Sequence, residues 1–558
     1  MMNNSSTNFM RFLHLGFLGT ASLLFVSGAA MAQPDAGQTL QETQQQAPAL
    51  PEASPDFVIE APRSAAPVQG GPKVVIQFIQ IEGNNAFSDD ALLAATGFGQ
   101  QQSLDLAGVK ALAERITDFY RAQGYPFARA LVPAQTMSGD VLKIHVVEGV
   151  YGSVQVTGHN ESRDAQAQKF LSCLKTGGVI KGEPLERATL ILDDQPGYRI
   201  TPIIRPGQHV GSGDLMVKLE RENLLGGDVG LDNHGNRYTG RARGYADFYA
   251  NSPFMLGDQF KISALYTEED MWFGSASYSL PVGHSGLRAS FGYTHTAYEL
   301  GKEFARLDAH GTADVASGGL SYSLLRSQKA NVTLGIAYQH KWLKDEEDSA
   351  GTRNSKTSAS LPIGLNFDRR DTFGGGGITY GAFSWTPGRL DLDSDLKRID
   401  NITAHSDGRF DKLNLDLARL QALGNNFTAF GRVSGQWSAD NLDSSESFGL
   451  GGPDGVRAYP TGEGYGDEGA LMQLELRYKV DAFEPYMFYD YGHVKFNNDP
   501  WAAGDNTRSV AGPGLGVRFE KGGWHADASA AWSTVGGDPQ SDTKDSSPMV
   551  WLRTGYKF

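Results

Sequence analysis

Apolar and polar side chains alternate with a period of two through residues 227–558, and this pattern constrains the fold more than any other feature. Successive side chains of a β-strand point to opposite faces, so each alternating segment predicts a strand with one apolar and one polar face. The apolar sets include Phe260, Ile262, Ala264 and Tyr266, then Leu287, Ala289, Phe291 and Tyr293, and at the end Val550, Leu552, Thr554, Tyr556 and Phe558.

Two architectures produce this alternation, a soluble antiparallel sheet and a closed barrel that crosses a membrane. The apolar faces end in aromatic residues, many polar faces are charged, and short connections alternate with long ones, which favours the barrel. The segments number about sixteen, an even number as in bacterial barrels, and we interpret the terminal aromatic residue, Phe558, as an assembly signal. Short connections are expected at residues 251–257, 281–285, 327–330 and 481–484, and long ones near 297–314, 344–356 and 440–467.

The preceding residues carry the same order of elements twice. The first copy predicts a strand at 74–81, helices at 88–95 and 106–119, and strands at 127–133 and 141–148. The second predicts strands at 152–157, 198–202 and 214–221 around helices at 165–173 and 184–194. Small modules with exposed strand edges suit the binding of extended chains, and a pair of purely structural α+β domains is the alternative.

The amino terminus resembles a targeting signal. Arg11 precedes an apolar run at 12–26, and Ala30 and Ala32 place small residues at cleavage-site positions, so residues 1–32 are predicted to be a signal peptide. An anchor helix is the alternative. Residues 33–73 contain seven prolines and few aromatic residues, which predicts a periplasmic linker, with a short helix at 37–47 as a candidate plug.

The predicted fold class is therefore two α+β modules, at 74–149 and 150–222, followed at 223–558 by an all-β antiparallel transmembrane barrel of about 16 strands. The net charge of −15 and the lack of a lysine or arginine cluster argue against binding to nucleic acid. The single cysteine, Cys173, excludes an internal disulfide framework and is expected to be buried. No hydrolase, metalloprotease or phosphate-binding motif is present, so neither enzymatic activity nor a cofactor is expected.

A glycine-rich loop with one arginine, Arg457, lies within residues 445–478 and leads into an alternating strand. Glycine permits close backbone approach, so this loop can fold into a confined space. An arginine placed there requires a partner of opposite charge.

These features together resemble the transporter family of two-partner secretion, which exports and activates haemolysins and filamentous adhesins, within the outer-membrane insertase superfamily. The small modules resemble its polypeptide-transport-associated (POTRA) domains. The loop tip Val456, Arg457, Ala458, Tyr459 is similar to the superfamily motif Val-Arg-Gly-Tyr, with alanine in place of glycine. The stretch Phe488, Tyr489, Asp490, Tyr491, Gly492 matches its partner motif Phe-x-Asp-x-Gly on the barrel wall.

The resemblance implies that the loop folds into the lumen and that Arg457 pairs with Asp490. It also implies an outer-membrane pore with periplasmic POTRA domains that binds an unfolded exoprotein, is surrounded by outer-membrane lipid, and is inserted by the barrel-assembly machinery. A membrane-protein insertase is an alternative, although it usually carries more POTRA modules. A passive porin is a second alternative, which would not need the periplasmic modules.

Overall fold

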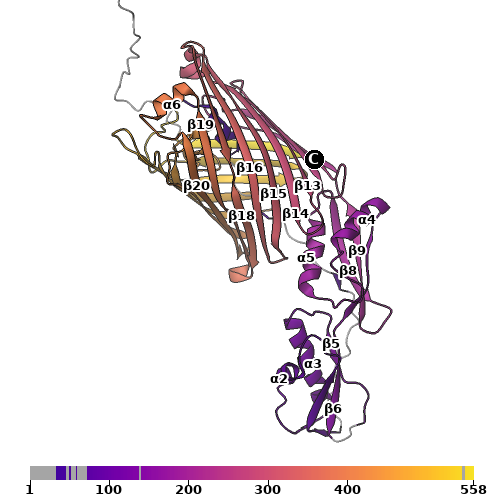
Figure 1. The fold of residues 1–558 in the computed structure, drawn as a ribbon. Coiled ribbons are helices and arrows are strands. Elements are labelled where there is room, and N and C mark those ends of the chain that lie inside the picture. Colours follow the sequence, from indigo (N-terminus) through magenta and orange to yellow (C-terminus); the bar gives the residue numbers. More distant parts are fainter. Residues whose placement is uncertain (1–32, 45–49, 52–57, 60–71, 137–139, 543–546) are drawn as a thin grey trace, which may run out of the picture. The chain divides into compact units, whose positions relative to one another are not determined.

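The structure is a computed structural model that describes residues 33–44, 50–51, 58–59, 72–136, 140–542 and 547–558 (Figure 1). The predicted signal peptide and most of the predicted linker lie outside the described residues. No helix within the described ranges is both long enough and apolar enough to cross a membrane.

A closed antiparallel barrel forms the carboxy-terminal part (Figure 1). The segments β17 and β18 pair with the same two neighbours, β16 and β19, so they form one strand that is interrupted at Leu361 and Pro362. The barrel therefore has sixteen strands, and the predicted fold class is confirmed. The segments are β10 (Leu225–Asp232), β11 (Arg243–Asn251), β12 (Gln259–Thr267), β13 (Trp272–Pro281), β14 (Leu287–Glu299), β15 (Ala309–Arg326), β16 (Ala330–Glu347), β17 (Thr352–Ser360), β18 (Ile363–Asp371), β19 (Gly377–Leu392), β20 (Gly408–Gly424), β21 (Phe427–Ser438), β24 (Glu468–Tyr478), β25 (Phe483–Lys495), β26 (Thr507–Lys521), β27 (Trp524–Ala531) and β28 (Met549–Lys557).

The first and last strands close the barrel. Pairing of β10 with β28 runs from Asp228 opposite Lys557 to Asp232 opposite Arg553. Phe558 extends this seam, because its backbone N–H and carbonyl exchange two hydrogen bonds of 3.1 Å with Gly227. The terminal aromatic residue thus belongs to the closing strand pair, while its role as an assembly signal stays a prediction.

Side chains alternate across the barrel wall as the sequence pattern predicts. Ile262, Tyr266 and Phe291 are exposed on the outer face, whereas Arg432 and Glu475 are buried on the inner face. Charged side chains that are buried on the inner face, as these two are, need partners of opposite charge within the protein.

The strand connections differ at the two ends of the barrel. Short turns follow β11, β13, β15 and β24, as predicted, and a further short turn follows β20. The opposite end carries long connections at 300–308 and 439–467, and a helix, α6 (Ser394–Asp400), lies in a third. The long loop predicted near 344–356 is wrong: β16 continues to Glu347 and β17 begins at Thr352, because cross-strand pairing extends through these charged residues.

The first amino-terminal module has its own hydrophobic core, formed by Leu92, Leu112, Ile116 and Ile144 among others. Ser88 caps α2 by accepting a hydrogen bond from the backbone N–H of Ala91. Its elements are β2 (Val74–Ile76), β3 (Phe78–Glu82), α2 (Asp89–Thr96), β4 (Gln102–Leu104), α3 (Leu106–Ala122), β5 (Arg129–Leu131) and β6 (Val141–Val147), and its main sheet has the order β3-β6-β5.

The second module repeats this arrangement around a separate core that includes Phe170, Leu185 and Leu215. Cys173 is exposed, so the prediction that it is buried is wrong: it lies in the turn after α4, while its neighbours Leu171 and Leu174 point into the core. The elements are β7 (Val150–Thr157), α4 (Glu161–Phe170), α5 (Gly182–Asp193), β8 (Tyr198–Pro206) and β9 (Ser212–Arg221), and a two-residue strand from the linker, β1 (Val58–Ile59), joins the edge of β8.

Candidate functional site

The connection between β21 and β24 folds into the barrel and places Arg457 in its interior. Val456 and Tyr459 have no exposed surface, and Arg457 is 5% exposed. Short elements organise the connection: η3 (Ser444–Glu446), β22 (Phe448–Gly449) and β23 (Tyr465–Gly466). Its apolar side chains pack against the wall, with Leu450, Val456, Ala458 and Tyr459 in one cluster with Leu471, Tyr486, Phe488, Val494, Val510 and Ala531.

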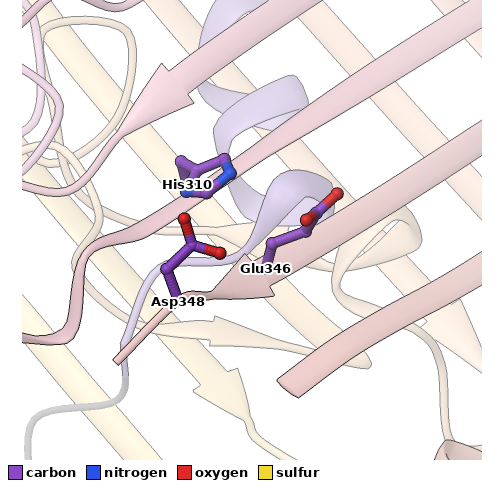
Figure 2. Close-up of side chains that lie close together, drawn as sticks. All are labelled: His310, Glu346 and Asp348. Atoms are coloured by element: carbon purple, nitrogen blue, oxygen red, sulfur yellow. The ribbon is translucent and has the colours of Figure 1, made fainter. Parts of the chain in front are cut away.

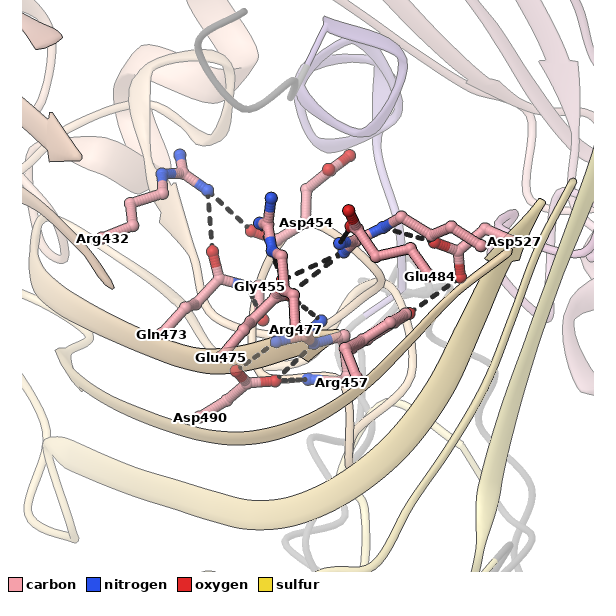
Figure 3. Close-up of polar contacts among 12 residues, drawn as sticks. Arg432, Asp454, Gly455, Arg457, Gln473, Glu475, Arg477, Glu484, Asp490 and Asp527 are labelled. Atoms are coloured by element: carbon pink, nitrogen blue, oxygen red, sulfur yellow. Dashed lines mark hydrogen bonds and ion pairs between the residues drawn. The ribbon is translucent and has the colours of Figure 1, made fainter. Parts of the chain in front are cut away.

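Arg457 and Asp490 form a two-pronged ion pair (Figure 3). Arg457 Nε and Nη2 each donate to one carboxylate oxygen of Asp490 at 2.8 Å. The backbone N–H of Arg457 donates to the same carboxylate at 3.1 Å. A guanidinium fork matched to a buried carboxylate fixes both distance and orientation, so the loop tip has one position relative to β25.

A second carboxylate, Glu475 on β24, completes the site and was missed by the sequence analysis. It accepts a hydrogen bond from Arg457 Nη1 at 2.5 Å and also pairs with Arg477 at 2.8 Å and Arg518 at 3.1 Å (Figure 3). The alternation within β24 already placed Glu475 on the polar face. Its position beside Arg457, however, depends on the strand register and on the depth of the loop in the lumen.

Two further residues of the barrel-wall motif, Phe488 and Gly492, contact the loop directly. The ring of Phe488 lies 3.6 Å from the Arg457 guanidinium carbon, a cation–π contact. Its opposite partner across the strand pair is Gly514, where an added Cβ would lie 2.1 Å from the ring. At Gly492 an added Cβ would lie about 3 Å from side-chain atoms of Leu450 and Val456, so this glycine admits the loop against the wall.

Ala458 replaces the glycine of the superfamily motif without backbone strain. It is not among the described residues with positive φ, so the position does not require glycine for its conformation. Space for its methyl group comes from Gly512 on β26, where an added Cβ would lie 2.5 Å from Ala458 Cβ. The neighbouring Tyr459 donates its hydroxyl hydrogen toward the carbonyls of Val535 and Gly537, at 2.7 and 2.8 Å.

Further contacts hold both the base and the tip of the loop, and the sequence analysis did not predict them. Glu463 pairs with Arg508 and accepts hydrogen bonds from the backbone N–H groups of Gln540 and Ser541. Trp551 on β28 donates its indole N–H to the carbonyl of Arg457 at 2.8 Å. The loop is therefore held by β24, β25, β26 and β28 together.

A short helix, α1 (Ala36–Gln44), lies against lumen residues and coincides with most of the helix predicted at 37–47. Asp35 pairs with Lys356 at 2.9 Å and accepts a hydrogen bond from Ser444 at 2.6 Å. The backbone N–H of Ala36 donates to Asp345 at 2.8 Å. At Gly37 an added Cβ would lie 2.6 Å from the backbone nitrogen of Ser445, so the helix approaches η3 closely.

The carboxyl-terminal half of α1 contacts the connection between β10 and β11. Glu42 accepts a hydrogen bond from Asn236 Nδ2 at 3.0 Å. Burial raises the pKa of Glu42 from 4.5 to about 7, because the charged form loses hydration that these contacts only partly replace. Glu42 is thus the group on α1 whose charge changes near neutral pH.

Comparison with known proteins shows which family has this architecture. The family described as "Haemolysin secretion/activation protein ShlB/FhaC/HecB" matches residues 211–519, which is more than half of the chain. The chain belongs to this family. The ShlB-type POTRA domain matches residues 74–149.

As a member of the haemolysin secretion/activation family, the protein is a two-partner secretion transporter of the outer membrane that works with a secreted exoprotein. Its POTRA domains are periplasmic, so the short turns face the periplasm and the long connections face outward. The chain is similar to the heme/hemopexin transporter protein HuxB of Haemophilus influenzae strain 86-028NP, with 26% identity over 92% of each chain. It is also similar to the outer membrane transporter CdiB of Escherichia coli, with 23% identity over 89% of this chain and 86% of the relative.

Solved structures share the fold. The structure of CdiB from Escherichia coli matches with a TM-score of 0.72 and 21% identity, and covers 89% of this chain and 93% of its own. CdiB from Acinetobacter baumannii matches with a TM-score of 0.66 and 18% identity, over 94% of this chain and 100% of its own.

Proposed function

We propose that this transporter captures its unfolded exoprotein at the POTRA domains and passes it through the lumen in extended form. The observation that carries this proposal is a cavity of about 470 Å³ formed by both modules beside the edge strand β5. Folding of the exoprotein outside the cell would drive transport, because the chain has no nucleotide-binding motif. No catalytic step and no cofactor are part of the proposal.

Backbone pairing at a strand edge is the general way to capture an extended chain. In the second module β1 already pairs in parallel with β8, with Val58 opposite Ile203. In the first module the central residue of β5, Ala130, donates its N–H to Thr117 Oγ1 at 3.0 Å. Both edges thus have partners in this state, so we propose that side-chain contacts in the cavity make the first capture and strand addition follows.

The cavity has the chemistry to bind an extended apolar segment with acidic flanks. Two of its apolar residues present much of their surface to solvent, with Leu131 48% and Val210 96% exposed. Guanidinium groups beside an apolar floor favour peptides in which apolar side chains alternate with Asp or Glu. The lining includes Phe127, Leu131, Val147, Ile180, Ile204 and Val210, with Arg121, Arg129 and Arg205.

Passage of the exoprotein requires room in the lumen, where α1 and the inward-folded loop now lie. We propose that α1 leaves and that the loop stays, held by Arg457. Two features support this order. The loop contacts four strands of the wall and pairs its arginine with two buried carboxylates, whereas α1 is a helix of nine residues that belongs neither to the wall nor to a strand connection.

Two further partners belong to this proposal. The barrel-assembly machinery would insert the protein, using the strand that ends at Phe558. Outer-membrane lipid would cover the exposed apolar and aromatic side chains of the outer face, which include Tyr266, Trp272, Phe291, Tyr338 and Trp342.

Substitution of the cavity lining in the full-length transporter tests the capture step. We expect Leu131→Asp and Arg129→Glu each to weaken binding of the exoprotein's amino-terminal domain to the detergent-solubilised transporter by at least about tenfold, and to reduce secretion into the medium. The matched control is Val75→Asp, which alters a similarly exposed valine of the same module outside the cavity.

Outer-membrane level and heat-modifiable gel mobility show whether each variant folds. Binding and secretion at wild-type values in folded Leu131→Asp and Arg129→Glu would rule out the cavity as the capture site. Equal loss in Val75→Asp would rule it out as well, because the effect would then come from the module as a whole.

A further inference from the structure

Three residues with metal-binding side chains meet at the extracellular end of β15 and β16 (Figure 2). His310 and Glu346 are direct cross-strand partners, and Asp348 follows β16 by one residue. One ligand atom from each of the three lies within 4.8 Å of the others. Within the described residues this is the only group of three His, Cys, Asp or Glu side chains that meets this distance.

A backbone carbonyl orients two of the three residues. The carbonyl oxygen of Asp308 lies 3.2 Å from His310 Nδ1 and accepts the backbone N–H of Asp348 at 3.2 Å. A carbonyl can only accept, so this contact places the imidazole hydrogen on Nδ1 and leaves the Nε2 lone pair free. Metal-binding histidines are commonly held in this way, with one ring nitrogen on a carbonyl and the other on the ion.

We propose that His310, Glu346 and Asp348 form a binding site for a divalent transition metal, with Zn²⁺ the best match. Zinc takes imidazole nitrogen and carboxylate oxygen at about 2.0–2.2 Å, and sites with three protein ligands keep a fourth position for water. In a tetrahedral site with bonds of this length the ligand atoms lie about 3.3–3.6 Å apart, so atoms that now lie within 4.8 Å of one another need to approach by at most about 1.5 Å. Calcium prefers six to eight oxygen ligands and is not matched by this set.

The charges around the site allow a cation to enter. Glu346 pairs with Arg353, whose Nε lies 3.0 Å from Glu346 Oε2. The Arg353 side chain is 77% exposed, so it can move away at little cost when a metal ion takes its place. Arg353 is therefore a competitor for Glu346, and its removal should strengthen metal binding.

The position of the site gives it a structural consequence. Glu346 follows Asp345, which accepts the N–H of Ala36 at the start of α1. A metal ion bound to His310, Glu346 and Asp348 would fix this end of β16 against β15. The neighbouring residue in β16, Asp345, is the one that binds α1.

Zinc titration of the full-length, detergent-solubilised transporter tests the proposal. We expect isothermal titration calorimetry to give one zinc ion per chain, and X-ray absorption to give one nitrogen and two oxygen protein ligands. The variants His310→Ala and Asp348→Asn should weaken binding by at least about tenfold, and Arg353→Ala should strengthen it. Ca²⁺ at the same concentration should not compete.

The matched control is His340→Ala, which removes a partly exposed histidine from the same strand outside this group. Zinc binding that is unchanged in His310→Ala, or lost equally in His340→Ala, would overturn the proposal. Absence of stoichiometric binding to a wild-type chain with normal heat-modifiable mobility would also overturn it.

Discussion

Trp551 donates its indole N–H to the backbone carbonyl of Arg457 at 2.8 Å, and so joins the last barrel strand to the tip of the lumen loop. Arg457 itself reaches β24 through Glu475 and β25 through Asp490. One residue thus ties three strands to a loop that is buried in the barrel. Any movement of the loop tip must break these contacts together.

Removal of either partner of the central ion pair should reduce secretion while the protein stays in the outer membrane. Arg457→Ala leaves Asp490 and Glu475 without their main cation, and Asp490→Ala removes the carboxylate that binds two guanidinium nitrogens. Loss of one partner of a buried pair costs about 3–5 kcal/mol, enough to free the loop. Immunoblots of medium and outer membrane measure the effect, with Arg389→Ala, from an exposed pair, as control. Wild-type secretion in both variants would contradict this role.

Glu475→Gln should impair secretion as strongly as Asp490→Ala. The substitution removes the charge that Arg457, Arg477 and Arg518 share and leaves three guanidinium groups without a common partner. Loop release is read directly by protease digestion of whole cells, where cleavage within residues 448–466 should appear only in the variant. If the loop of Glu475→Gln stays protected from protease and secretion is normal, Glu475 is not needed to hold the loop.

Gly37→Ala should loosen α1 from the lumen. Alanine is more favourable than glycine inside a helix by about 1 kcal/mol, so helix propensity alone predicts that α1 docks more tightly. The added methyl group would meet the backbone of Ser445, which predicts the opposite result. Planar-bilayer recordings should give higher mean conductance than wild type. Thr43→Ala, which removes only a hydrogen bond within the helix, should leave conductance unchanged. Lower conductance in Gly37→Ala would contradict the docked geometry.

Docking of α1 should weaken as pH rises through about 7. The pKa of Glu42 is about 7 when docked, against 4.5 normally, so the docked helix holds a proton that the free helix releases. This contribution is complete below about pH 4.5 and is lost as the pH passes the docked value. Bilayer conductance should therefore rise between pH 5.5 and 8.

Glu42→Gln is the matched variant, because it keeps the shape of the side chain and cannot titrate. Its conductance should be nearly independent of pH in this range. The charged groups that act on Glu42, Asp35 and Arg243, stay unchanged in the variant. An equal pH response in wild type and Glu42→Gln would assign the effect to other groups.

The barrel could be predicted from the sequence because its signal is local. Alternation within each strand, turn residues between strands and the two motifs around Arg457 and Asp490 can all be read from short windows. The contacts of Glu475, Glu463 and Trp551 with the loop could not be predicted, because they depend on strand register and on the depth of the loop in the lumen. The long loop predicted near 344–356 is wrong for a related reason: β16 and β17 pair through most of this segment, and Asp345 within it accepts the N–H of Ala36 on α1.

Closure of the barrel has a consequence for folding kinetics. The seam joins Asp228 to Lys557, more than 300 residues later in the chain, and Phe558 completes it. One edge of β10 pairs with the next strand, β11, but the other edge has no partner until β28 has been made, and it stays available for wrong pairing until then. Barrel closure is thus a pairing of very long range, which is slow to form, and conditions that keep the free edge of β10 unpaired favour the correct seam.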